Sequence, residues 1–152
     1  MPGFFLILLL FFFPVAAFAD SAQEIFTPAE KRRFDSARSL DNRIRVYDTA
    51  LQRIRKEVEN NIREERFEDA ARTLSNWSAL LTKSLSDIEA NATPGRISRR
   101  LRQYEISLRQ ALGGMRSLSL RAPLDLFDAI ESFSEQAEET RRKFIDILFN
   151  VE

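Results

Sequence analysis

The chain has 152 residues, with 23 Lys and Arg against 23 Asp and Glu, and it contains no histidine and no cysteine. This length suits one compact domain. The zero net charge provides no excess of either sign that would attract nucleic acid or an anionic membrane without specific contacts. The missing thiols and imidazoles exclude cysteine nucleophiles, disulfides and the usual histidine-containing metal sites. We therefore expect no cofactor, no bound metal and no nucleic-acid partner.

The first 19 residues differ from the rest because none of them is charged. Ten apolar residues run without a break over 4–13, and the small-any-small triplet AFA follows at 17–19. This order is typical of the apolar region and cleavage site of a signal peptide. A membrane span needs about 20 apolar residues, more than this stretch offers. We predict a signal peptide over 1–19, cleaved between Ala19 and Asp20.

The predicted leader implies that the rest of the chain is exported. Export of a cysteine-free domain suits a bacterial periplasm better than the disulfide-rich secreted domains of animals, so we expect a periplasmic or secreted protein. The three residues before Phe4 contain no Lys or Arg, although signal peptides normally begin with positive charge. Retention of residues 4–19 as a membrane anchor is the alternative, and we expect membrane contact only in that case.

After a short extension over 20–27, apolar residues recur every three or four positions, as in helices that pack along a shared seam. The first helix is predicted over 28–62, with Thr27 as its N-cap and Glu30 completing a capping box. Three more helices are predicted, over 67–91, 95–120 and 124–149. The third contains Gly113-Gly114, and we expect it to continue through them because the apolar register is kept on both sides.

Four amphipathic helices with short connections predict an all-α domain over 28–152. We expect an antiparallel up-down four-helix bundle with left-handed coiled-coil-like packing. The net charges of the four helical segments alternate along the chain in the order positive, negative, positive, negative. In a square bundle of successive neighbours, each helix would then lie beside two helices of opposite sign. The alternation thus favours this arrangement over one with a crossed connection.

Four arginines crowd the start of the third predicted helix: Arg96, Arg99, Arg100 and Arg102. Positive charge opposes the helix macrodipole at this end, so we expect an anionic group nearby. One interpretation is an external anion, such as a lipid headgroup, an envelope polymer or an acidic protein. The other is internal, with Asp87, Glu89, Asp146 and Glu152 at the ends of the second and fourth helices neutralising the arginines.

Three apolar residues lie off the predicted seams and are expected to face solvent: Ile106, Ile145 and Phe149. Exposed apolar clusters often mark contact surfaces, so these residues are a second candidate interaction site. Such a surface is also compatible with the formation of an oligomer.

Three large aromatic residues lie on the seams, namely Tyr47, Trp77 and Tyr104. We expect them in the core rather than around a ligand. Their polar atoms need hydrogen-bond partners there, which Ser84 and Thr140 can supply because they are the polar members of the seams.

The carboxylates suggest no catalytic pair, because adjacent glutamates on a helix do not face each other. We therefore expect no enzyme, but an exported bundle that acts through protein or cell-envelope contacts. A small-ligand-binding or sensor-like bundle is the alternative. Its pocket would lie near Gly113 and Met115, where the glycines leave a notch.

Overall fold

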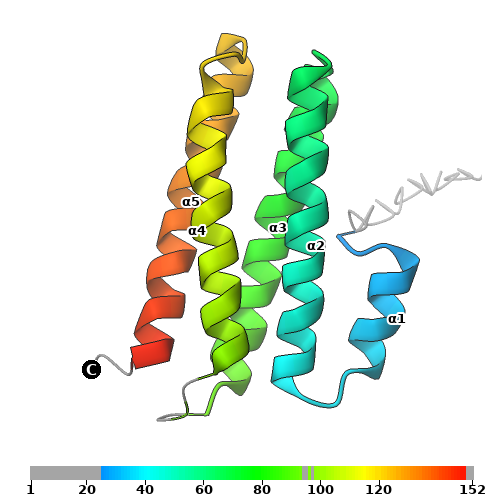
Figure 1. The fold of residues 1–152 in the computed structure, drawn as a ribbon, viewed down its shortest axis with the longest axis vertical. Helices are drawn as coiled ribbons and strands as arrows, with labels where there is room; N and C mark the ends of the chain where they lie inside the picture. Colours follow the sequence, from blue (N-terminus) through cyan, green and yellow to red (C-terminus); the bar gives the residue numbers. More distant parts are fainter. Residues whose placement is uncertain (1–24, 94–95, 97, 150–152) are drawn as a thin grey trace, which may run out of the picture.

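The computed structural model describes residues 25–93, 96 and 98–149 of the chain. All regular secondary structure in these residues is helical, which confirms the all-α class (Figure 1). The helices are α1 (Pro28–Ser36), α2 (Leu40–Arg63), α3 (Phe67–Asn91), α4 (Arg99–Ser119) and α5 (Leu124–Phe149). No described helix combines the length and the apolar character that a membrane crossing requires. The predicted leader and its cleavage site at Ala19–Asp20 lie outside the described residues.

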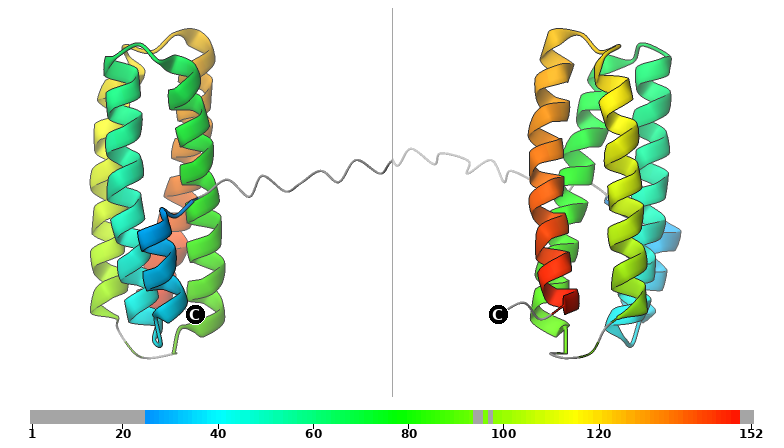
Figure 2. Two further views of the ribbon diagram at one scale, coloured as in Figure 1. Left: turned by 90° about the vertical axis from the view of Figure 1, so that its right-hand side faces the viewer. Right: turned by 60° about the vertical axis from the view of Figure 1, so that its left-hand side comes forward.

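The four long helices stand side by side, and each has two neighbours. Helix α2 packs against α3 and α4, and α5 packs against α3 and α4. Within the described residues, the backbones of α2 and α5 do not approach each other closely, nor do those of α3 and α4, so these pairs meet only through side chains in the core. The order around the bundle is therefore α2, α3, α5, α4. Successive helices run in opposite directions (Figures 1 and 2), so α2 and α4 are parallel neighbours, as are α3 and α5.

The predicted order of neighbours is wrong, because helices of like charge lie together. Helix α2 has six Lys and Arg against four Asp and Glu, and α4 has five against one. Helix α3 has two against four, and α5 has three against seven. One side of the bundle, made of α2 and α4, thus carries a formal charge of +6, and the opposite side carries −6.

Apolar packing explains why charge does not select the neighbours. The Tyr47 and Tyr104 ring centroids lie 6.4 Å apart between α2 and α4, and those of Trp77 and Phe133 lie 4.6 Å apart between α3 and α5. Burial of one large apolar side chain contributes about 1.5–3 kcal/mol, whereas an exposed ion pair contributes about 1 kcal/mol or less. The connection over 92–98 can span about 20 Å, which is enough to cross the bundle.

The predicted helix over 28–62 is in fact two helices. Ala37 and Ser39 are extended, with ψ of 119° and 154°, and the Ser39 side chain caps α2 by accepting a hydrogen bond from the Asn42 N–H. Helix α1 therefore folds back along the lower part of α2 (Figure 2). Its predicted capping box is confirmed, with Thr27 and Glu30 each bonding the other's backbone N–H.

Aromatic stacking and an ion pair hold α1 in place. The Phe34 ring lies 5.1 Å from that of Phe26 and 5.3 Å from that of Tyr47, between centroids. The Arg53 guanidinium donates to both carboxylate oxygens of Glu30, at 3.0 and 2.9 Å. Glu30 is only 6% exposed, so this pair is largely shielded from water.

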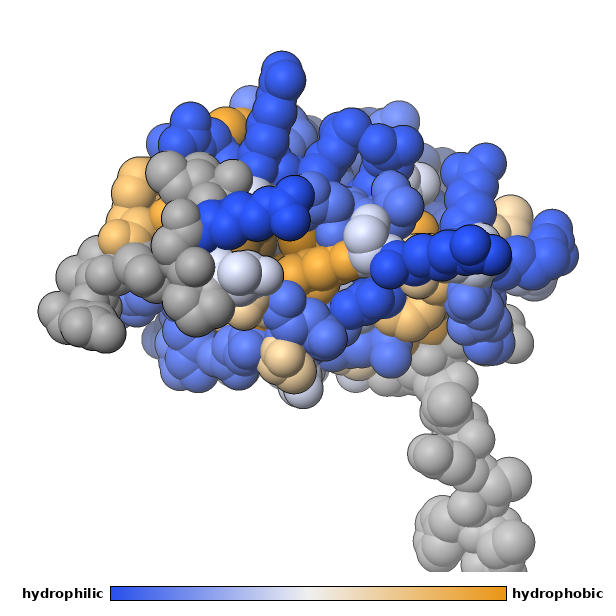
Figure 3. Space-filling view, turned by 90° about the horizontal axis from the view of Figure 1, so that it is seen from below, coloured by the Kyte–Doolittle hydropathy of each residue, from blue (hydrophilic) through white to orange (hydrophobic). Residues whose placement is uncertain are grey.

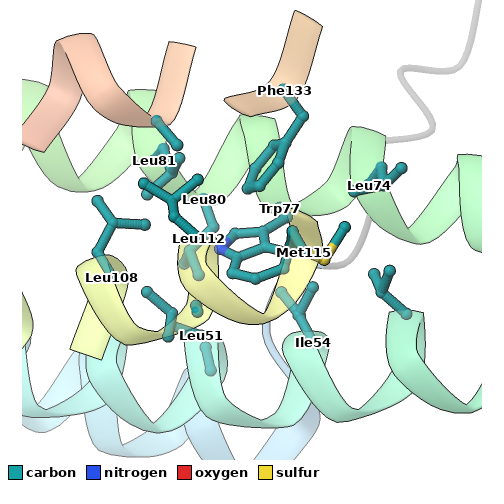
Figure 4. Packing of buried hydrophobic residues seen from close by; sticks show 14 of the residues in the cluster. Leu51, Ile54, Leu74, Trp77, Leu80, Leu81, Leu108, Leu112, Met115 and Phe133 are labelled. Carbon is teal, nitrogen blue, oxygen red and sulfur yellow. The ribbon is translucent and has the colours of Figure 1, made fainter. Parts of the chain in front are cut away.

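The core contains most of the described seam residues, and the predicted burial of Tyr47, Trp77 and Tyr104 is confirmed. Figure 4 shows Trp77 among apolar side chains of the other long helices. The Tyr104 hydroxyl bonds Ser84 Oγ at 3.0 Å, as expected, whereas the Tyr47 hydroxyl donates to Asp87 Oδ2 at 3.1 Å. Burial raises the pKa of both phenols well above their ordinary value, so both stay neutral. The Trp77 indole N–H has no hydrogen-bond partner in the described part of the chain.

Candidate functional site

The start of α4 is fixed by a serine cap. Ser98 accepts a hydrogen bond from the Leu101 N–H at 3.0 Å, so α4 begins at Arg99 rather than at the predicted residue 95. The Ser98 hydroxyl also donates to Asp41 Oδ1 at 2.9 Å and thereby ties α4 to the first turn of α2. The first turn of α4 contains no acidic residue, so its arginines are not balanced within the turn.

The four arginines of the predicted cluster are all exposed, and none forms an ion pair with another described residue. The expected internal neutralisation is not found. Asp87 instead binds Arg43 of α2 at 2.8 Å, and α3 lies diagonally across from α4. Glu89 and Asp146 are exposed and form no ion pair within the described ranges. Glu152 lies outside them.

The other two arginines of α4 are also unpaired, because Arg109 and Arg116 are exposed and form no ion pair with a described side chain. The one acidic residue of α4, Glu105, is 8% exposed and accepts from Arg141 of α5 at 3.0 Å. In α2 and α5 some arginines have a carboxylate partner, namely Arg43, Arg53, Arg55 and Arg141, whereas exposed arginines such as Arg45 and Arg142 have none among the described residues. All five arginines of α4 are therefore exposed without a direct ion pair to a described residue.

The arginines of α4 form a regular row. Arg102, Arg109 and Arg116 are spaced by seven residues, which brings each one almost above the last at intervals of about 10.5 Å. A second set with the same spacing, Arg99, Ile106 and Gly113, runs beside it. We call the outward surface made by these six residues the arginine face.

The arginine face has a hollow at its lower end. A depression of about 350 Å³ is lined by Arg99, Arg102, Gln103 and Ile106. These residues follow the spacing i, i+3, i+4 and i+7, which in a coiled coil forms the hole that receives one side chain of a facing helix. The hollow combines an apolar residue with two guanidinium groups, so it can hold an apolar side chain and bind flanking carboxylates.

The predicted apolar patch is only partly exposed. Ile106 and Ile145 are half-buried rather than solvent-facing, and only Phe149 is well exposed, at 57%. Ile145 lies one turn beyond Arg141, which pairs with Glu105, so it lies on the side of α5 toward α4. Ile106 itself lies on α4 and lines a surface depression together with Arg99 and Arg102.

Two more exposed apolar residues were not expected. Leu120 and Leu124 are 84% and 74% exposed, on either side of the turn that contains Pro123. Their exposure could have been predicted from the sequence, because both residues lie close to Pro123, at a turn where the apolar seam is interrupted.

The structure does not bring Gly113 and Met115 together around the predicted pocket. Helix α4 continues through both glycines, as predicted. Gly113 faces outward, with nothing within 4 Å of the position a Cβ would take, whereas Met115 is buried in the core. The two residues therefore lie on different sides of α4 and line no common notch.

Within the described residues, no group of three or more acidic side chains is arranged to hold a metal ion. Protein-family models, curated proteins and solved structures give no match to this chain.

Proposed function

We propose that this chain is an exported, non-catalytic helical bundle that binds an acidic helix of a partner protein through the arginine face. The observation that carries the proposal is the lack of any ion pair between the five arginines of α4 and another described residue. Such a row repels itself and opposes the macrodipole at its start. An acidic partner would relieve both effects.

The chemistry of the arginine face favours carboxylates on a helix. A guanidinium group binds a carboxylate through two parallel hydrogen bonds. The seven-residue spacing of Arg102, Arg109 and Arg116 matches acidic residues with the same spacing on a facing helix. Gly113 lets a second helix come close, because it has no side chain. Ile106 is the only apolar side chain among the six residues of the arginine face and is half-buried, so this face offers little apolar surface for insertion into lipid.

Export and the finer packing are part of the proposal. The uncharged leader over 1–19 supports export. Mass spectrometry of the protein from its native host is expected to find a chain that begins at Asp20, and a chain that keeps residues 4–19 would favour the membrane anchor. The spacing of the buried residues supports left-handed coiled-coil-like packing of α2–α5.

The test of the arginine face uses a helical peptide with glutamate at every seventh position, titrated into the full chain. The variant Arg102→Gln, Arg109→Gln, Arg116→Gln removes three charge pairs of about 0.5–1 kcal/mol each, so we expect roughly 10-fold to 100-fold weaker binding. Affinity should also fall as salt is raised.

A matched control removes the same charge from the neighbouring helix. Arg45, Lys56 and Arg63 of α2 are exposed and have no ion pair with a described residue, so their replacement by glutamine should leave binding almost unchanged. Equal losses in both triple variants would refute a specific role for α4. Disordered polyglutamate or phosphatidylglycerol vesicles binding more tightly than the helical peptide would refute the helical partner.

A further inference from the structure

A cavity opens at the lower end of the bundle, where α2 and α4 begin and α3 and α5 end. Its volume is about 180 Å³. Figure 3 looks onto this end and shows apolar residues at the centre with hydrophilic residues around them. The cavity is lined by Ser39, Leu40, Asp41, Ile44, Asn91, Ala92, Thr93, Arg96, Ser98, Leu101, Ile147 and Leu148. It therefore has an apolar floor and a polar rim.

The floor is built from aliphatic side chains of three helices. Ile44 of α2, Leu101 of α4 and Leu148 of α5 are at most 5% exposed and belong to the main core. An apolar cavity of about 150 Å³ is large enough to hold benzene. The floor therefore suits a branched aliphatic or small aromatic group, but not a long acyl chain.

The rim carries one cation and one anion. Arg96 is exposed and forms no ion pair in the described part of the chain. Asp41 accepts the Ser98 hydroxyl through Oδ1, and its Oδ2 accepts from no described donor. The bond from Ser98 holds the carboxylate at the rim, because Ser98 is itself fixed as the cap of α4. A ligand above the floor thus meets a guanidinium group and a carboxylate together.

We infer that this cavity binds a free α-amino acid with an aliphatic side chain. The side chain lies on the apolar floor, the ligand carboxylate binds the Arg96 guanidinium, and the ligand ammonium binds Asp41 Oδ2. A purely anionic ligand would pair with Arg96 but would be repelled by the Asp41 carboxylate. A purely cationic ligand would pair with Asp41 but would be repelled by Arg96. This inference does not depend on the partner proposed for the arginine face, because Arg96 lies at the cavity rim and outside that face.

The test is calorimetric titration of the full chain with L-leucine, in parallel with glycine, 4-methylpentanoate and isoamylamine. These analogues lack the side chain, the ammonium and the carboxylate, respectively. We expect leucine to bind with a dissociation constant of about 1 mM or tighter, and each analogue to bind at least about 10-fold more weakly.

Variants locate the binding to the cavity. Arg96→Gln and Asp41→Asn should each weaken leucine binding about 10-fold or more, since each removes a charged hydrogen bond but keeps a polar group. Ala92→Leu should abolish it by filling the cavity from a half-buried position. Arg100→Gln, an exposed residue that does not line the cavity, is the control and should have no effect.

Three outcomes would overturn the inference: no heat of binding with leucine, equal binding of 4-methylpentanoate, or unchanged affinity in Ala92→Leu. A thermal melt of each variant shows that the fold is intact before affinities are compared.

Discussion

Replacement of Trp77 by alanine is expected to lower the free energy of unfolding by about 3–5 kcal/mol. The indole is 0% exposed and lies at the centre of the bundle, against the ring of Phe133 and among side chains of three other helices (Figure 4). No small movement of the helices can refill so large a space. Urea denaturation followed by circular dichroism measures the loss.

The variant Trp77→Phe separates the contribution of ring size to stability from the contribution of the indole N–H. Phenylalanine loses part of the apolar contact but also removes the indole N–H, which has no described partner. An unpaired buried donor costs about 1–3 kcal/mol, so this gain should offset much of the loss. We expect a net change below about 2 kcal/mol. A loss as large as that of the alanine variant would show that the N–H is hydrogen-bonded in solution.

Replacement of Arg53 by methionine is expected to release α1 from the bundle. The change leaves the Glu30 carboxylate buried with only the Thr27 N–H as a described hydrogen-bond donor. The loss of charged hydrogen bonds costs about 1.5–3 kcal/mol, which is large for a helix of nine residues. Hydrogen exchange should become fast over 25–39 and remain slow in the cores of α2–α5.

The control for this variant is Arg55→Met. Arg55 also pairs with a carboxylate, Glu59, but both belong to the same helix and are more exposed than Glu30. Such pairs contribute about 0.3–0.5 kcal/mol, so exchange in α1 should not change. Retention of slow exchange over 25–39 in Arg53→Met would contradict the assigned role of the Glu30–Arg53 pair.

Acid should release α1 from the unmodified chain as well. Burial alone would raise the pKa of Glu30, but the hydrogen bonds from Arg53 and from the Thr27 N–H outweigh it and hold that pKa below its ordinary value of 4.5. The ionised carboxylate therefore stabilises the folded state at a pH above 4.5, and this contribution is lost as the pH falls through the lowered pKa. Protection over 25–39 should disappear in that acidic range before the long helices unfold.

The long helices and their buried faces could be predicted because their apolar spacing repeats over many turns. Trp77 and Tyr104 lie at seam positions and are fully buried. The break between α1 and α2 was not predicted, because Ala37 and Leu40 continue the apolar spacing across it. The serine at Ser39 was the available signal, since it caps α2 in the structure. A local cap that interrupts a continuous seam is difficult to recognise from one sequence.

The order of neighbours could not be predicted from net charge. Charges on exposed helix faces are screened by salt and contribute little, whereas buried apolar contacts, such as that between the rings of Tyr47 and Tyr104, stabilise the observed order. A connection of seven residues between α3 and α4 permits either arrangement. Sequence patterns give the inward face of each helix, but they do not distinguish an adjacent helix from a diagonal one.

The candidate site was predicted in part. The cluster from Arg96 to Arg102 was predicted as a site because its positive charge opposes the helix dipole. Ile106 was predicted as an exposed contact residue because it lies off the apolar seam. Arg109 and Arg116 were missed, although their seven-residue spacing from Arg102 was visible in the sequence. The cavity could not be foreseen, because its walls come from the ends of four helices that are distant in the chain.

The placement of α4 beside α2 is the claim on which both proposed sites depend, and engineered disulfides test it most directly because the chain has no cysteine of its own. A disulfide requires Cα atoms within about 7 Å, and diagonal helix axes in a square bundle lie about 12–14 Å apart. The pair Asp41→Cys and Ser98→Cys joins α2 to α4 and should form an intramolecular disulfide. The pair Glu89→Cys and Arg100→Cys joins α3 to α4 and should remain reduced under the same oxidation. The opposite result would place α3 beside α4 and contradict the arrangement described for this protein.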